Sequence, residues 1–90
     1  MFRYRRGSKV SYEKQGYVYF TSRRYKFMPQ EKQREILNLC VEAGGEYYQA
    51  LFEYVTTEIS EVAVTMKHYI SKATLNRIAR KYLECFPDYF

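Results

Sequence analysis

The chain has few of the residues that build catalytic, metal or redox centres. Its 90 residues include one histidine, two cysteines, four glycines and no tryptophan. Cys40 and Cys85 are far apart in the sequence and neither has a neighbouring histidine, so a zinc site is not expected. No glycine-rich loop is present to hold a phosphate group, and no serine or cysteine stands beside a plausible base. The sequence therefore predicts no enzyme, no bound metal and no cofactor.

Long apolar runs are also missing. No segment approaches the roughly 20 apolar residues that a membrane-spanning helix needs. The first ten residues, MFRYRRGSKV, lack the continuous apolar stretch of a secretory signal. We therefore expect a cytoplasmic protein with no membrane partner and with both thiols reduced and buried. A chain of this length has room for one core, so residues 1–90 are predicted to form a single domain.

Tyrosine and positive charge are the two features in excess. The chain has 11 tyrosines, and its 15 lysines and arginines outnumber its 10 acidic residues to give a net charge of +5. This charge is unevenly placed, with +7 on residues 1–27, −5 on residues 28–66 and +3 on residues 67–90. Two basic ends around an acidic middle predict a polyanion-binding surface that is assembled from both ends of the chain.

Residues 9–27 have the pattern of a β-hairpin. The segments KVSYE and YVYFT are rich in β-branched and aromatic residues and are separated by KQG. Gly16 can supply the positive φ that a short hairpin loop requires, and Val10 and Tyr12 alternate with polar residues. The sequence therefore predicts a basic arm at residues 1–8 and a hairpin at residues 9–27.

Residues 28–90 carry apolar residues at helical spacing. Four stripes are present: Ile36, Leu39, Cys40 and Ala43; Tyr47, Ala50, Leu51 and Tyr54; Ile59, Val62, Ala63 and Met66; and Leu75, Ile78, Ala79, Tyr82 and Phe86. Pro29 is expected at the first position of the first helix, and Gly44 and Gly45 are expected to end it. The predicted fold is α+β and mainly α, with an N-terminal hairpin packed on a compact body of three to four helices.

The last predicted helix has an apolar stripe on one side and a basic face on the other. Ser71 is a suitable N-cap, because its hydroxyl can accept a hydrogen bond from a free amide of the first turn. The basic face holds Ala73, Asn76, Arg77, Arg80 and Lys81. Asparagine and arginine can bond to base edges in the major groove while other cations meet phosphates. An ordinary solvated surface helix has a similar composition, so both interpretations remain open.

The segment ISKATLNRI, residues 70–78, resembles the second half of the helix-turn-helix of bacterial repressors and recombination accessory proteins. The residues that match this pattern are Ile70, Ser71, Thr74, Leu75, Arg77 and Ile78. The resemblance implies a helix-turn-helix-like unit within the helical body. It also implies that the residues nearest the bases are Lys72, Ala73, Asn76 and Arg77.

The upstream half departs from this pattern. An alanine, and four residues later a glycine, normally allow the two helices to cross closely. With Ala63 and Met66 on the inward face of the first helix, the connection to Ile70 is expected to be two residues longer, and it contains no glycine.

These features favour a small sequence-specific DNA-binding protein. Proteins of this size and charge occur among the transcription regulators and recombination accessory factors of phages and mobile elements. The predicted DNA-binding residues are Lys72, Ala73, Asn76, Arg77, Arg80 and Lys81 of the last helix, with Arg3, Arg5, Arg6, Arg23 and Arg24 of the N-terminal region. A palindromic target would require a dimer, and no heptad repeat supplies one, so the oligomeric state stays open.

Two other functions fit the same composition. The chain could be a protein-interaction module or inhibitor that docks on a host nucleoprotein through its tyrosine- and arginine-rich hairpin, because these residues are enriched at interface hot spots. It could also bind single-stranded nucleic acid without sequence preference by stacking bases on aromatic rings. The rings expected to do so are those of Tyr4, Tyr17, Tyr19 and Tyr25.

Overall fold

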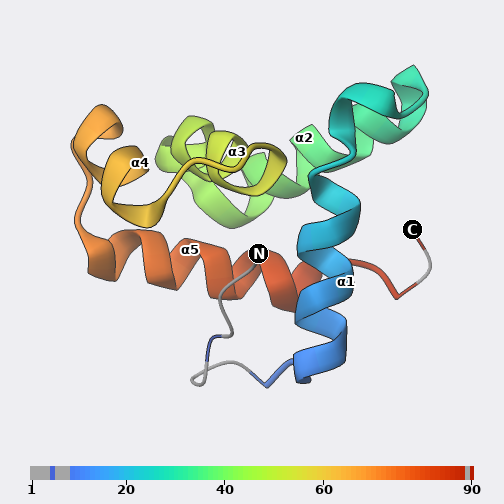
Figure 1. Ribbon diagram of the computed structural model, residues 1–90, viewed down its shortest axis with the longest axis horizontal. Coiled ribbons are helices and arrows are strands. Elements are labelled where there is room, and N and C mark those ends of the chain that lie inside the picture. The colour runs from blue at the N-terminus through green and yellow to red at the C-terminus, as the bar shows by residue number, and fades with distance from the viewer. Residues whose placement is uncertain (1–4, 6–8, 89) are drawn as a thin grey trace.

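The computed structural model describes residues 5, 9–88 and 90, which form five α-helices and two short 3-10 helices (Figure 1). The α-helices are α1 (Tyr12–Ser22), α2 (Gln30–Gly44), α3 (Tyr48–Thr56), α4 (Glu61–His68) and α5 (Lys72–Cys85). The 3-10 helix η1 (Tyr25–Phe27) precedes α2, and η2 (Gly45–Tyr47) precedes α3. No strand occurs in this part of the chain. The predicted α+β class is therefore wrong, and the described fold is entirely helical.

The hairpin predicted at residues 9–27 is replaced by α1. Ser11 caps this helix, since its hydroxyl accepts a hydrogen bond from the backbone N–H of Lys14 at 3.2 Å. The side that α1 turns inward consists of Gln15, Val18, Tyr19 and Ser22. These residues have helical spacing, but two of the four are polar. The hydropathy pattern therefore does not indicate an amphipathic helix here. The alternation that indicated a strand was a coincidence of neighbouring aromatic residues.

Helices α2, α3 and α5 bury most of the stripes expected of them, while Leu39 and Tyr47 are half-buried. Ile36, Cys40 and Ala43 are buried on α2; Ala50, Leu51 and Tyr54 are buried on α3; and Leu75, Ile78, Ala79, Tyr82 and Phe86 are buried on or just after α5. Helix α2 packs against both α3 and α5, which places the core between these three helices. Pro29 is the N-cap of α2 rather than its first residue.

Helix α1 crosses the C-terminal half of α5 (Figure 1). The hydroxyls of Ser22 and Tyr82 lie 2.6 Å apart in the buried contact between the two helices. The ring of Tyr17 meets that of Phe86 edge to face, with centroids 6.0 Å apart. The N-terminal region is therefore part of the same core as the helices that follow it.

The stripe predicted for the third helix of the body is wrong. Ser60 caps α4 by accepting a hydrogen bond from the N–H of Ala63 at 3.1 Å, and this start sets the rotation of the helix. As a result α4 buries Val64 and Thr65, while Val62 and Met66 are exposed. Such a short helix has only a few inward positions. One polar residue among them is enough to prevent the sequence from showing which side of the helix faces the core.

The two cysteines differ in their surroundings. Cys40 is fully buried on α2, and burial raises the pKa of its thiol to about 12. Cys85 is exposed at the last residue of α5, so the prediction that both thiols are buried holds for Cys40 only. Among the described residues, no helix is both long enough and apolar enough to cross a membrane.

Candidate nucleic-acid interface

Helices α4 and α5 are joined by a tight connection of three residues, Tyr69, Ile70 and Ser71. Tyr69 has a left-handed backbone with φ 56° and ψ 44°, and its side chain is 94% exposed. The N–H of Ile70 donates to the carbonyl oxygen of Thr65 at 3.1 Å, which closes the end of α4. Ser71 then caps α5, since its hydroxyl accepts from the N–H of Thr74 at 3.0 Å.

This connection is shorter than the sequence predicted. Helix α4 continues to His68 instead of ending near Met66, and the expected two-residue extension is therefore wrong. Tyr69 adopts the left-handed backbone conformation that glycine usually adopts at the end of a helix. A tyrosine carries no sequence signal for positive φ, which is why the short connection was not visible in the sequence.

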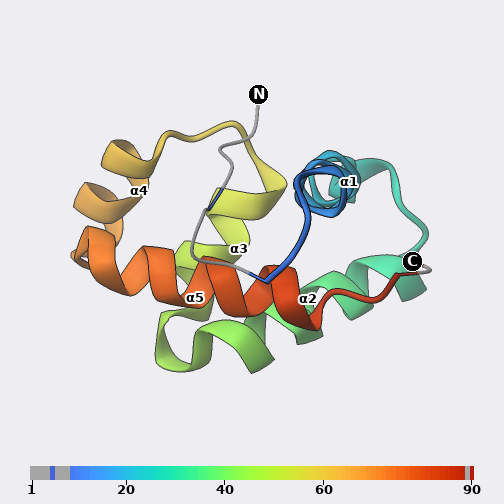
Figure 2. The ribbon, with the colours of Figure 1, turned by 90° about the horizontal axis from the view of Figure 1, so that it is seen from below.

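The side of α5 that faces away from the core is positively charged. Lys72, Ala73, Arg77 and Lys81 are exposed and Arg80 is half-buried; together they make up the α5 basic face. Figure 2 shows α5 in front of α2 and α3, so these two helices leave one side of α5 uncovered. Within the described residues, no side-chain hydrogen bond or ion pair occupies any of its four cations.

Arg5 has the opposite environment. Its side chain is buried, and its guanidinium donates hydrogen bonds to the hydroxyls of Tyr19 at 3.2 Å and Tyr54 at 2.8 Å. It also donates to the amide oxygen of Asn76 at 2.6 Å and forms an ion pair with Glu61 at 2.8 Å. These partners come from α1, α3, α5 and α4, and we call the five residues the Arg5 cluster.

The cluster holds its arginine in the charged form. Burial by itself lowers the pKa of Arg5, but the oxygen atoms of Tyr19, Tyr54 and Glu61 outweigh this effect and raise the pKa above its ordinary value. The Arg5 backbone is fixed as well: its N–H donates to Gln15 at 2.8 Å, and the Gln15 amide donates back to the Arg5 carbonyl at 3.2 Å. This pairing explains why α1 carries a glutamine on its inward side.

Two predicted DNA-binding residues are therefore occupied inside the protein. Arg5 faces inward with its donors in use, and the amide oxygen of Asn76 accepts from Arg5 instead of facing a ligand. We remove both from the candidate interface. Arg3 and Arg6, with the remainder of the predicted basic arm, lie outside the described residues.

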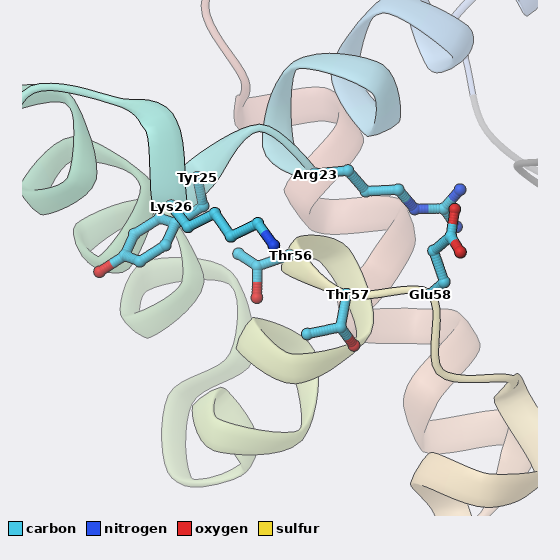
Figure 3. Close-up of a pocket in the computed structure, with 6 residues that line it drawn as sticks. All are labelled: Arg23, Tyr25, Lys26, Thr56, Thr57 and Glu58. Carbon is cyan, nitrogen blue, oxygen red and sulfur yellow. The ribbon is translucent and has the colours of Figure 1, made fainter.

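Arg23 and Arg24 lie on a different part of the surface from the α5 basic face. They follow the C-terminal end of α1, which Figure 1 shows near the start of α2 and apart from the N-terminal half of α5. Arg24 is exposed, whereas Arg23 is half-buried at the edge of a pocket of about 500 Å³. Figure 3 shows its lining residues, Arg23, Tyr25, Lys26, Thr56, Thr57 and Glu58, which combine two cations with one carboxylate.

The tyrosines proposed to stack on single-stranded bases are mostly engaged. Tyr19 is buried in the Arg5 cluster, and the ring of Tyr25 packs edge to face on Phe52 with centroids 5.0 Å apart. The ring of Tyr17 meets Phe86, and Tyr4 lies outside the described residues. The three described rings, those of Tyr17, Tyr19 and Tyr25, are therefore not assembled into one platform.

The residues that could ligate a metal are dispersed. In residues 5, 9–88 and 90, no three histidine, cysteine, aspartate or glutamate side chains come close enough to share a metal ion. Glu53 bonds instead to Lys67 at 2.9 Å and to His68 at 2.8 Å, and these hydrogen bonds lower the pKa of its carboxyl. No protein-family model, curated protein or solved structure matches the chain.

Proposed function

We propose that the protein binds double-stranded DNA by placing the N-terminal half of α5 in the major groove. The observation that carries this proposal is the α5 basic face, where four cations lie on an open side of one helix and pair with no described carboxylate. A polyanion is the natural ligand for unpaired cations arranged in this way.

The arrangement of the two helices supports the same proposal. In helix-turn-helix proteins the second helix enters the groove after a turn of about three to four residues. Here α4 has eight residues and the connection to α5 has three. Thr65, which is buried, and Tyr69, which is left-handed, have the spacing of the alanine and glycine in that pattern. Residues 70–78 supply the part of the pattern that the sequence already resembled.

Each residue of the α5 basic face has a distinct proposed role. Ala73 is short and lies in the first turn, so the helix can approach the floor of the groove closely. Arg77 lies one turn further and can form two hydrogen bonds to the O6 and N7 atoms of a guanine. Lys72, Arg80 and Lys81 flank these two residues and are assigned to phosphates. Regulation or recombination in a phage or mobile element stays a prediction from the sequence.

The alternative of docking through a hairpin has no hairpin to use. The residues assigned to the hairpin form α1 and η1, and Val18 and Tyr19 of α1 are buried. The interaction module inferred from the sequence is therefore not proposed in that form.

Selection from a random duplex library, followed by fluorescence anisotropy on the enriched site, tests the proposal. The Arg77→Ala change should weaken binding by about 1–3 kcal/mol and relax preference for one base pair. The Arg80→Ala change should weaken all duplexes alike and lower the slope of log K against log salt by about 1. Removing both arginines should combine the two effects, with weaker binding to every duplex and a relaxed preference at the base pair that Arg77 contacts.

The matched control is Arg34→Ala, which removes the same charge from an exposed position on α2. This variant should bind the selected site as the unmodified protein does. A library that yields no enriched sequence would disprove sequence-specific binding. Equal affinities for the Arg77→Ala/Arg80→Ala and Arg34→Ala variants would remove α5 from the interface.

A further inference from the structure

A second positively charged surface lies around η1, at the connection between α1 and α2 (Figure 1). It contains two of the most exposed large apolar side chains, Phe20 at 66% and Phe27 at 72% exposed. Exposed apolar side chains that gather on one surface frequently mark an interaction site. We call this region the basic aromatic surface; its members are Phe20, Arg24, Lys26, Phe27, Lys32 and Phe90.

The surface is hollowed between its rings. A pocket of about 380 Å³ is lined by Phe20, Phe27 and Phe90, with Met28 and Pro29 also in the wall. Arg24 and Lys32 contribute to the same lining, and no carboxylate does. Since ligand pockets begin at about 300 Å³, this hollow suits one or two large apolar side chains.

A cation lies over each of the three rings. The Arg24 guanidinium is 5.9 Å from the centre of the Phe20 ring, and the Lys26 ammonium is 5.3 Å from that of Phe27. The Lys32 ammonium is 4.7 Å from the centre of the Phe90 ring. Lys32 also pairs with Glu35 at 3.2 Å, whereas Arg24 and Lys26 form no ion pair within the described residues. The unpaired Arg24 thus borders the apolar hollow, and the unpaired Lys26 lies next to it, over the Phe27 ring.

We propose that the basic aromatic surface docks an acidic segment of a partner protein. The segment would insert a large apolar side chain into the hollow and place its carboxylates against Arg24 and Lys26. Both parts of the surface are then used: burial in the hollow supplies affinity, and charge complementarity selects acidic partners.

Single-stranded nucleic acid is the other polyanion that meets basic aromatic surfaces, and the geometry disfavours it here. Base stacking requires an accessible ring face. In this surface the protein's own cations lie over the rings of Phe20, Phe27 and Phe90. The apolar space lies between the rings, where a large apolar side chain can enter.

The proposal is independent of DNA binding. The α1–α2 connection, which carries most of the basic aromatic surface, lies apart from the N-terminal half of α5, so a protein could dock at one without covering the other (Figures 1 and 2). A failure of either proposal therefore leaves the other in place.

The absence of tryptophan from the chain provides a direct test. The probe is a short peptide of aspartate and glutamate with a central tryptophan–leucine pair, whose fluorescence is then the only tryptophan signal. On addition of the protein, its emission should shift to the blue and its anisotropy should rise. The Phe27→Ala and Arg24→Glu variants should each bind it about tenfold more weakly or worse.

Controls are available in both the protein and the probe. Arg77→Glu makes the same charge change on α5 as Arg24→Glu makes here, and it should leave peptide binding unchanged. A peptide with lysine in place of the acidic residues should not bind. Because Phe27 is largely exposed, its truncation should preserve the thermal unfolding transition measured by circular dichroism; Phe20→Ala serves as a second variant if it does not.

Three results would overturn the proposal. The first is the absence of any spectral change with the acidic peptide. The second is equal binding of the lysine peptide. The third is a labelled single-stranded oligonucleotide that binds and loses affinity in the Phe27→Ala variant while the peptide does not bind, which would assign the surface to nucleic acid.

Discussion

The N-terminal region and the α4–α5 unit are both basic, yet they place their arginines in opposite environments. Arg5 lies inside the protein among four side-chain oxygen partners, whereas Arg77 lies on the surface with none among the described residues. The amphipathic pattern around Arg77 predicts its exposure, but nothing in the local sequence of Arg5 predicts its burial. What separates a structural arginine from a ligand-binding one is whether the fold brings acceptors to it, and those acceptors come from distant positions.

The two regions are also connected. Arg5 bonds to Glu61 on α4 and to Asn76 on α5, so the N-terminal region stabilises the unit that we propose reads DNA. The charge of residues 1–27 is therefore not all available to a polyanion. The comparison yields three predictions, beginning with the one of largest expected effect.

The strongest test replaces each arginine by a residue of similar length without charge. Arg5→Met should lower the free energy of unfolding by about 3–5 kcal/mol, because it removes the buried cation that bonds to Tyr19, Tyr54, Asn76 and Glu61. Arg77→Met should change it by less than about 0.5 kcal/mol, since the side chain is exposed. Urea denaturation of the two variants measures both values, and similar losses would erase the distinction between the regions.

Alkaline pH should weaken the Arg5 cluster, and it should also act on the buried Cys40 and Tyr82, whose pKa values burial raises too. Burial raises the pKa of Tyr54 from 10.0 to about 12, and burial also raises the pKa of Tyr19. A raised folded-state pKa contributes stability that is complete below the unfolded value and is lost as the pH rises through the folded value. Stability should therefore fall between pH 10 and about 12, by about 2–3 kcal/mol from Tyr54 alone.

This loss can be followed by urea denaturation across that range of pH, with tyrosinate absorbance recorded in parallel. The buried tyrosines should ionise only as the protein unfolds, while they ionise near pH 10 in denaturant. A constant free energy of unfolding from pH 10 to 12 would show that the cluster does not hold its tyrosines in the neutral form.

The smallest effect concerns the connection in the α4–α5 unit. Tyr69 has a positive φ, which costs a residue with a side chain about 1–2 kcal/mol, and part of this is offset by the flexibility of glycine in the unfolded chain. Tyr69→Gly should therefore raise stability by up to about 1 kcal/mol. The opposite change, Gly45→Ala at φ 57°, should lower it, although a Cβ there would meet no atom within 4 Å. Thermal unfolding of both variants tests the assignment, and a loss in Tyr69→Gly would contradict it.

The parts of the fold that could be predicted are those whose inward residues are all apolar. Helices α2, α3 and α5 meet this condition, and the exposure of Lys72, Arg77 and Lys81 follows from the amphipathic pattern of α5. Helix α1 does not meet it, because Gln15 and Ser22 occupy inward positions. Their reason for being there lies in the bonds to Arg5 and Tyr82, which are tertiary contacts.

The candidate site was predictable to the same extent. The sequence predicts helix α5 from its apolar stripe and its N-cap. The pairing of Asn76 with Arg5 spans 71 positions, so no local sequence pattern predicts it. The hollow beside Phe27 depends on Phe90, which is equally remote in the sequence. Distant pairings of this kind require the tertiary structure.

The Arg5 cluster also constrains how the sequence can diverge. A single replacement within the cluster removes a hydrogen-bond partner from buried charged or polar groups and lowers stability. Exchanging the whole set for apolar residues of similar volume is often neutral or favourable for stability. Substitutions at these positions are therefore expected to be inherited together. A distant homologue should carry either an apolar replacement of the set or the complete set, Arg5, Tyr19, Tyr54, Glu61 and Asn76. Covariation of these five positions can therefore be used to identify distant homologues.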